Sequence, residues 1–361
     1  MGSRLMVFAS SSSHIGGYSD RILVNLRLFI VTHSVVAFLL IASCAGATVL
    51  PTPTATPTST PTPTPAAVIG FNAGSFPSAD PDWTARLTRS LSPIPSTYSP
   101  VIFLDVKAAL ANTVIQQAFD LEVLGLLDTL QPGASTSVDS AVVAFSSDGN
   151  GLITVIQGAL DVDGLLAAAS GLGLVAPGQE PEEYRGYEVR SVDVFGISLG
   201  LASVDEFTLI IATGSSTGGA TGLEQIRTAL DSSDGLASGL LEDPGTFNLV
   251  NELPAGVRAV VLADCGNLTA LFSPNALQGC TRAAISAEVA ESGSGVINAI
   301  LEYEDESQAS AAIDSIDREG FQLDDLTIQK VAAVQEGSLL WLRLQADLEQ
   351  VAMAFDILGL P

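Results

Sequence analysis

The chain has little histidine and little lysine. Its 361 residues include 2 histidines, His14 and His33, and both precede residue 44. Lysine occurs only at Lys107 and Lys330. Histidine is the usual base that activates a catalytic serine. A chain without its first 43 residues therefore has no Ser-His-acid triad.

Positive charge is also scarce. The chain has 14 Lys and Arg residues against 40 Asp and Glu, and its formal net charge is −26. Nucleic acids and anionic lipid surfaces are bound through cationic side chains, so we predict no nucleic-acid partner. A strongly acidic surface suits cationic partners, divalent metal ions or a saline exterior, and it also simply keeps a protein dispersed. Dispersal is the plainest interpretation.

The front of the chain has an uncharged apolar stretch. No charged residue lies between Leu28 and Leu50, and Arg21 and Arg27 precede this stretch. A basic flank, an apolar run and small residues are the layout of a secretory signal. A run of threonine and proline, 51–65, follows. Because proline fixes its backbone and donates no amide hydrogen, we expect an extended spacer of ~45 Å.

The four residues at this junction, Ile41-Ala42-Ser43-Cys44, resemble the lipobox of bacterial lipoproteins. In that family the cysteine is lipidated and becomes the first residue of the mature protein. The resemblance implies a signal peptide at 1–43 and a linker at 44–66 that begins with lipidated Cys44. It also implies a lipid bilayer as partner, and a location at the cell membrane facing outside the cytoplasm. Stable anchoring needs more than one acyl chain, which a diacylglyceryl group supplies.

The alternative to a lipid anchor is an uncleaved transmembrane helix. The stretch from Leu28 to Leu50 is long enough to span a bilayer, since ~20 apolar residues suffice. Arg21 and Arg27 favour the cytoplasmic side, so both alternatives place the remainder outside. Cleavage before Cys44 would remove three arginines and one aspartate, and the net charge would change from −26 to −28.

Cysteine is the third scarce residue. With Cys44 assigned to lipid, Cys265 and Cys280 remain. Export favours oxidation, and an even remainder favours a disulfide. That bridge would close a loop of about 15 residues and stabilise the fold by ~3 kcal/mol. Two buried thiols are the alternative. We predict no metal site here, because no histidine is near and the spacing is not Cys-x-x-Cys.

The rest of the chain resembles two copies of one pattern. A Gly-rich turn, an apolar run and an Ala-rich segment occupy 146–170 and recur at 290–314. Asp161 and Asp305 stand where helix N-caps belong. The flanks also correspond: 101–105 matches 260–264, and 207–230 matches 338–355. We therefore predict two halves, 67–240 and 241–361, with their boundary within 232–254.

The predicted fold class is α+β, with each half an antiparallel sheet that has helices packed on one face. The first half carries a longer helical insertion, 106–130, where the second has the loop between Cys265 and Cys280. The pattern is similar to exported lipoproteins built from duplicated α+β units. That resemblance transfers no active site.

Two segments fit the Gly-x-Ser-x-Gly pattern of esterases, around Ser198 and Ser216. Without a histidine base, a turn or a loop explains both better. The Gly-rich loop 214–222 has the composition of a phosphate cradle but lacks its lysine. Thr221 and Glu224 form a capping box, which accounts for this sequence without a ligand.

Acidic residues supply the other candidates. Asp148, Asn150, Asp161 and Asp163 could converge on calcium, but the spacing of a calcium loop is incomplete, and turns and caps are the simpler interpretation. The acid pairs 182–183, 304–306 and 324–325 could suit a glycosidase, although such pairs are common in so acidic a chain. The segment 184–187 is either an aromatic contact patch or the start of a strand.

These observations predict a membrane-anchored extracytoplasmic lipoprotein with a non-catalytic binding or envelope-structural role and with no cofactor or metal. A carrier of lipid or apolar solute is the first alternative, and it requires a large apolar cavity. A carboxylate-dependent hydrolase is the second, and it requires two carboxyl groups ~5–9 Å apart in one pocket.

Overall fold

The structure is a computed structural model. It describes residues 81–111, 137–147, 149, 151–171, 180–194, 197–215, 220–254, 259–269, 271–289, 294–319 and 329–347. The predicted signal peptide, Cys44, the linker, most of the predicted helical insertion and the predicted helix after 347 lie outside these residues.

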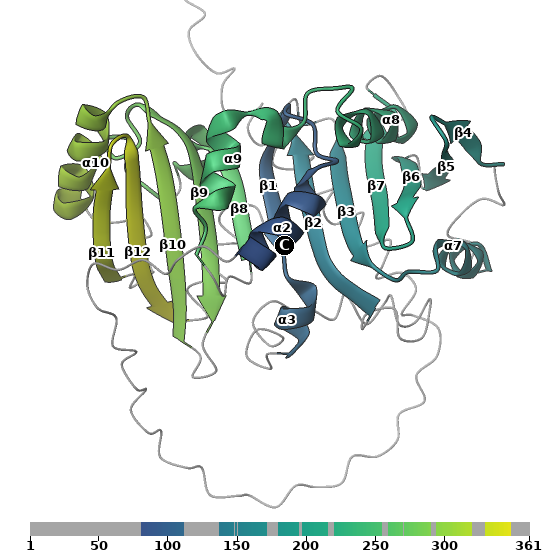
Figure 1. Cartoon of the computed structure of the whole chain (residues 1–361), viewed down its shortest axis with the longest axis horizontal. Coiled ribbons are helices and arrows are strands. Elements are labelled where there is room, and N and C mark those ends of the chain that lie inside the picture. Colours follow the sequence, from purple (N-terminus) through teal and green to yellow (C-terminus); the bar gives the residue numbers. More distant parts are fainter. Residues whose placement is uncertain are drawn as a thin grey trace, which may run out of the picture.

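Helices are interspersed among runs of consecutive strands along the described chain (Figure 1). The helices are α2 (Pro81–Leu91), α3 (Val106–Ala111), α7 (Val162–Gly171), α8 (Gly222–Ser233), α9 (Pro244–Asn251) and α10 (Glu306–Glu319), with 3₁₀ turns η2 (Leu240–Glu242) and η3 (Cys265–Leu268). The strands are β1 (Tyr98–Leu104), β2 (Val138–Ser146), β3 (Leu152–Gly158), β4 (Glu182–Tyr184), β5 (Tyr187–Val194), β6 (Ile197–Asp205), β7 (Thr208–Ser215), β8 (Ala259–Asp264), β9 (Cys280–Val289), β10 (Ser294–Tyr303), β11 (Gln329–Glu336) and β12 (Leu339–Asp347).

All the described strands belong to one antiparallel sheet. Its order is β11-β12-β10-β9-β8-β1-β2-β3-β7-β6-β5-β4, and the protein is therefore α+β. The prediction of one antiparallel sheet per half left open whether the two sheets join, and the structure joins them into one, because β1 pairs with β8 from Val101–Leu262 to Leu104–Ala259. An unpaired inner edge would leave backbone amides and carbonyls without partners, and the pairing satisfies both edges at once. We call this β1–β8 junction the seam.

Helices cover both faces of the sheet, whereas one face was predicted. One apolar cluster contains residues of α2, α8 and α9, together with Ile300 and Trp341 of the sheet. The other contains residues of η3 and α10, together with Leu301 and Leu342. Side chains alternate between the faces of a strand, so β10 and β12 offer apolar residues to both sides. The second half therefore has α9 on one face and α10 on the other.

Polar residues fix the starts of the helices as predicted. The side chains of Asp161 and Asp305 accept hydrogen bonds from the amides of Gly164 and Gln308, each at 2.9 Å. Thr221 and Glu224 form the predicted capping box at α8. The hydrogen bond from the Thr221 amide lowers the pKa of Glu224, and that from the Gln308 amide lowers the pKa of Asp305.

Within the described ranges, none of the helices combines the length and the apolar character that crossing a membrane requires.

Candidate functional site

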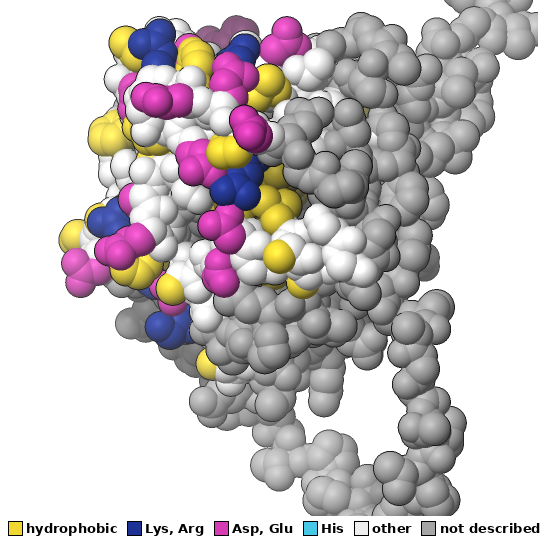
Figure 2. Space-filling view, turned by 90° about the vertical axis from the view of Figure 1, so that its right-hand side faces the viewer, with side chains coloured by type: hydrophobic (Ala, Val, Ile, Leu, Met, Phe, Trp, Pro, Cys, Tyr) yellow, Lys and Arg dark blue, Asp and Glu magenta, His cyan; other side chains and the backbone are white. Residues whose placement is uncertain are grey.

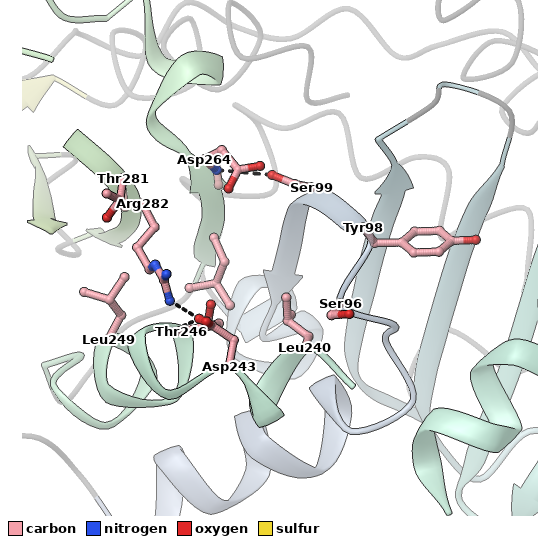
Figure 3. A pocket seen from close by; sticks show the side chains of 13 residues that line it. Ser96, Tyr98, Ser99, Leu240, Asp243, Thr246, Leu249, Asp264, Thr281 and Arg282 are labelled. Carbon is pink, nitrogen blue, oxygen red and sulfur yellow. Dashed lines mark hydrogen bonds and ion pairs between the residues drawn. The ribbon is translucent and has the colours of Figure 1, made fainter. Parts of the chain in front are cut away.

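A pocket of about 270 Å³ lies at the seam, between the sheet and the segment formed by η2 and α9 (Figure 3). Three strands and two helical segments contribute to it, and they come from both halves of the chain. Its lining residues are Ser96, Tyr98, Ser99, Leu240, Asp243, Thr246, Leu249, Leu262, Ala263, Asp264, Thr281, Arg282 and Ala283. Hydroxyl and charged groups meet leucine side chains there, so the pocket suits a small polar ligand with a short apolar part.

Asp243 holds the first turn of α9 at this pocket. It is the N-cap residue, and its carboxylate accepts a hydrogen bond from the Thr246 amide at 2.7 Å. Pro244 follows at the first helical position, where a missing amide hydrogen costs nothing. Local sequence therefore places this carboxylate at the rim.

Arg282 of β9 is the positively charged residue among those that line the pocket. It pairs with Asp243, and its Nε lies 2.9 Å from Glu302 Oε2 on β10. The guanidinium lies against the first turn of α9, where any side chain at Gly245 would collide with it. Two carboxylates thus share one arginine, which leaves the cluster with a net negative charge.

Asp264 adds a third carboxylate at the end of β8. Ser99 Oγ accepts hydrogen bonds from the Asp264 amide at 3.1 Å and from Asn267 Nδ2 at 3.3 Å, which ties the first half to the second across the seam. The Asp264 carboxylate itself is exposed and pairs with no cation among the described residues. It is available to a positively charged or hydroxylated ligand.

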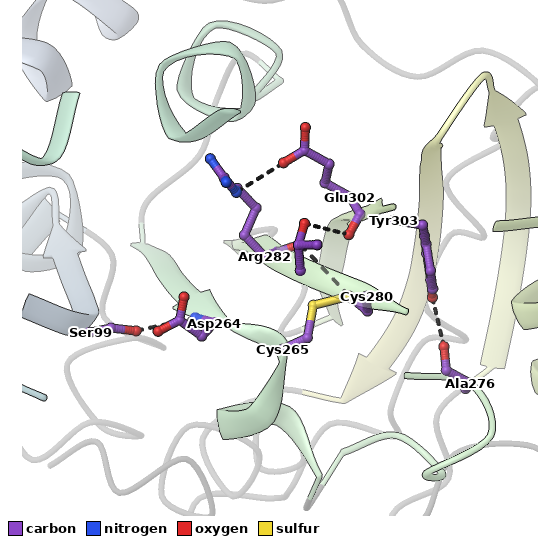
Figure 4. The surroundings of a disulfide bond; sticks show 9 residues. Ser99, Asp264, Cys265, Ala276, Cys280, Arg282, Glu302 and Tyr303 are labelled. Atoms are coloured by element: carbon purple, nitrogen blue, oxygen red, sulfur yellow. Dashed lines mark hydrogen bonds and ion pairs between the residues drawn. A yellow bond between two sulfur atoms is a disulfide. The ribbon is translucent and has the colours of Figure 1, made fainter. Parts of the chain in front are cut away.

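A disulfide lies next to Asp264 and Thr281 (Figure 4). Cys265 follows Asp264, Cys280 precedes Thr281, and their Cα atoms are 5.7 Å apart. The bridge joins the end of β8 to the start of β9, the two strands that carry Asp264 and Arg282. It therefore holds together the strand ends on which Asp264 and Arg282 stand opposite each other.

The loop between the cysteines is held to the sheet by Tyr303. Its hydroxyl donates a hydrogen bond of 2.7 Å to the Ala276 carbonyl. Burial raises the pKa of Tyr303 far above its usual value, so this donor keeps its proton.

The surface on the side of β4 and β5 also carries acidic groups. Figure 2 shows their carboxylates interspersed with a smaller number of basic groups. A second cavity, of about 310 Å³, lies on this part of the molecule and is lined by Asp161, Asp163, Glu188 and Arg190, among others. Arg190 already pairs with Asp163 and Glu188 there.

The predicted serine motifs have structural roles where they are described. Ser198 is buried within β6, and its Oγ accepts a hydrogen bond from the Gly222 amide at 3.2 Å. Ser216 lies outside the described residues. The end of the Gly-rich loop leads into the capping box of α8, so the cap interpretation is confirmed there.

The predicted acidic candidates do not converge on a metal site. Asp161 caps α7 and Asp163 pairs with Arg190, while Asp148 and Asn150 lie outside the described residues. No group of three or more potential metal ligands occurs in the described part of the chain. Of the acid pairs, Glu182 binds Arg227 and Asp305 caps α10, and 324–325 is not described.

The aromatic segment 184–187 is the β4–β5 hairpin. Arg185 and Gly186 form its turn with positive φ angles of 54° and 85°. Tyr184 OH lies 3.0 Å from the carboxylate of Asp231, and Tyr187 OH lies 2.8 Å from that of Asp234. The two tyrosines therefore tie the edge hairpin to α8.

Sequence reasoning did not single out Asp243 or Arg282. Asp-Pro before an apolar segment is a helix-start signature that could have marked Asp243. Arg282 carries no local signature, because its two partners lie on α9 and β10.

The comparisons with known proteins assign no family. No family model and no curated protein matches the chain. Among solved structures, crystal form I of TP0453 is similar with a TM-score of 0.48 and 9% identity, covering 74% of this chain and 97% of that chain. Crystal form III of TP0453 gives the same TM-score and identity, covering 75% and 98%. A likeness of this degree assigns neither a fold family nor a function.

Proposed function

We propose that the protein is an extracytoplasmic, lipid-anchored binding protein without catalytic activity. The apolar stretch, the lipobox-like residues that end at Cys44 and the Thr/Pro run support the anchor. The observation that carries the proposal is the disulfide between Cys265 and Cys280, since structural disulfides persist mainly in oxidising compartments.

We further propose that the pocket at the seam binds a small polar ligand that carries an amine. Arg282 is already shared by Asp243 and Glu302, whereas the Asp264 carboxylate remains accessible beside Thr281 and Ser99. An ammonium group that replaces part of its hydration with this carboxylate and the nearby hydroxyls gains charge-assisted hydrogen bonds. The strongly acidic chain also attracts cations to its surface.

We infer in addition that the two halves are copies of one unit. Outward from the seam the strand orders are β1-β2-β3-β7-β6 and β8-β9-β10-β12-β11. A local two-fold axis through the Ile102–Val261 pair relates the two halves. Under this axis, each pair of neighbouring strands in one of these orders corresponds, in the same register, to a pair in the other. For example, the row Val101–Ala144–Ile153–Ala212–Gly200 falls on Val260–Ser286–Asn298–Arg343–Ala332.

The anchor is tested by the intact mass of protein extracted from membranes after fatty-acid labelling. We expect a chain that begins at Cys44, carries acyl groups and lacks two hydrogens at the disulfide. Cys44→Ser should lose the label. The double variant Cys265→Ser/Cys280→Ser is the matched control and should keep it. An unlabelled chain with residues 1–43 still attached would contradict the proposal.

The pocket is tested by titrating the full chain with 1,4-diaminobutane, with 1,4-butanediol as an uncharged probe of the same length. We expect the diamine to bind and the diol to bind far more weakly. Asp264→Asn should weaken diamine binding by about tenfold. Asp314→Asn, an exposed acid on α10, is the control and should leave it unchanged. Equal losses in both variants would mean that only the overall charge attracts the diamine.

A further inference from the structure

The outer edge of β11 ends the sheet on one side. Among the described residues β11 pairs only with β12, from Gln329–Gln345 to Glu336–Leu339. The opposite end of the sheet is β4, a strand of 3 residues. Short edge strands resist further pairing, while longer ones offer a row of backbone donors and acceptors to another chain. β11 therefore offers another chain a longer row of backbone donors and acceptors than β4 does.

The first half covers the equivalent edge itself. In the two-fold correspondence β11 is the counterpart of β6, and Ala333 is the counterpart of Leu201. The outer edge of β6 is occupied by β5, which pairs antiparallel with it from Val189–Ala202 to Val194–Ile197. The hairpin is fastened to α8 through Tyr184 and Tyr187. This edge therefore accepts an antiparallel strand within the molecule.

The connection at the equivalent point of the second half is too short to contain such a hairpin. Residues 172–196 connect α7 to β6 and include β4 and β5. Only residues 320–328 connect α10 to β11, which is a shorter stretch than the hairpin 182–194 alone. Among the described residues, no strand takes the place on β11 that β5 takes on β6.

We propose that a second copy of this chain occupies that place, with the two β11 strands pairing antiparallel about a two-fold axis at Ala333. Identical strands pair symmetrically in this way, and the interface closes as a dimer. The register places Ala333 opposite its own copy and Ala332 opposite Val334. Small residues thus meet at the centre of the pairing.

Two features of the molecule limit the strength of this dimer. A bulge between Lys330 and Ala332 interrupts the register with β12, so the regular part of the edge is short. Each copy also carries a net charge of −26, or −28 after cleavage before Cys44, and the copies repel each other at low ionic strength. We therefore expect association to increase with added salt, because screening weakens the repulsion.

Cysteine trapping in membranes tests the pairing with the full chain. Opposite residues in an antiparallel pair have Cα atoms ~4.5–5.5 Å apart, within the range of a disulfide. Under a mild oxidant Ala333→Cys should give a covalent dimer on a non-reducing gel. Leu201→Cys is the matched control at the edge that β5 covers, and it should stay monomeric. Equal yields from the two variants would overturn the proposal.

A second measurement uses the unaltered protein. Sedimentation of the detergent-extracted chain should give a dimer fraction that rises with protein concentration and between ~0.1 and ~1 M salt. A monomer at every concentration and salt level would overturn the proposal. So would a covalent adduct of Ala333→Cys whose mass exceeds the chain by anything other than a second copy, because the occupant would then be a different protein. Neither readout depends on the proposed ligand of the seam pocket.

Discussion

At the scale of single residues, glycine decides how closely α8 approaches the sheet. Gly200 of β6 faces the first turn of α8, and a Cβ at Gly200 would lie 2.6 Å from the carbonyl carbon of Gly222. A Cβ at Gly214 of β7 would lie at the same distance from the amide nitrogen of Gly222. Real Cβ atoms do not approach backbone this closely, so only glycine allows this packing.

Gly200→Ala should therefore destabilise the protein by about 1–3 kcal/mol, because α8 must shift to accept the methyl group. Gly171→Ala is the matched control: a Cβ there meets nothing within 4 Å, and alanine suits the helix. We expect Gly171→Ala to be neutral or stabilising by up to ~1 kcal/mol. Urea unfolding of both variants measures the difference. A Gly200→Ala protein as stable as the parent would contradict the close contact.

Under the proposed two-fold correspondence, the two halves differ at one row of buried residues. Ala144, Ile153 and Ala212 are apolar and fully buried. Their counterparts in the second half are Ser286, Asn298 and Arg343, and these are buried as well. Asn298 donates a hydrogen bond of 3.0 Å to Glu288. Burial lowers the pKa of Arg343, and the charge of Glu288 opposes that shift. This row is therefore polar in the second half and apolar in the first.

At the scale of elements, the helix starts were predictable from sequence and the partners of the strands were not. Asp161, Asp305 and Thr221 act on amides a few residues away, so short patterns identified them. The seam joins strands far apart in the chain, and no local pattern specifies which apolar strand pairs with which. The same limit hid the contact of Arg282 with Asp243. Apolar residues on both sides of β10 also made the number of covered faces ambiguous.

The helix caps give the protein an acid-sensitive component of stability. The pKa of Glu224 is lowered in the folded state, because the carboxylate accepts a hydrogen bond from the Thr221 amide. A carboxylate with a lowered folded pKa stabilises the fold above its unfolded pKa of ~4.3, and this contribution disappears as the pH falls through the folded pKa. Glu224→Gln should therefore flatten the loss of unfolding free energy below ~pH 5.

Chemical unfolding at a series of pH values measures this effect. Asp314→Asn, which removes an exposed acid from the side of α10, is the control for the loss of one negative charge. If Glu224→Gln and the parent lose stability in parallel on acidification, the cap contributes nothing in its charged form.

At the scale of the whole molecule, the two halves share one core on the face of α2 and α9. Trp83 and Leu87 of α2 belong to the first half, Leu249 and Val250 of α9 belong to the second, and all four lie in the same apolar cluster. The seam adds a backbone ladder between the halves. The two halves of the chain therefore pack as one unit.

Residues 67–240 and 241–361 should accordingly fail to fold when each is produced alone, because each would expose a strand edge and an apolar face at the seam. Produced together, they should form a soluble complex with the far-ultraviolet circular dichroism of the intact chain. Sedimentation and circular dichroism check both statements. A soluble, folded 67–240 fragment would mean that the first half is an independent domain.

The position of β1 also determines how the molecule responds to mechanical load. Figure 1 places α2 and β1, the first described elements, at the middle of the sheet. A pull on residue 81 from the preceding chain loads α2 first and then β1, which is held by two ladders, to β2 and to β8. Because β2 belongs to the first half and β8 to the second, a force on β1 is distributed to both halves of the sheet.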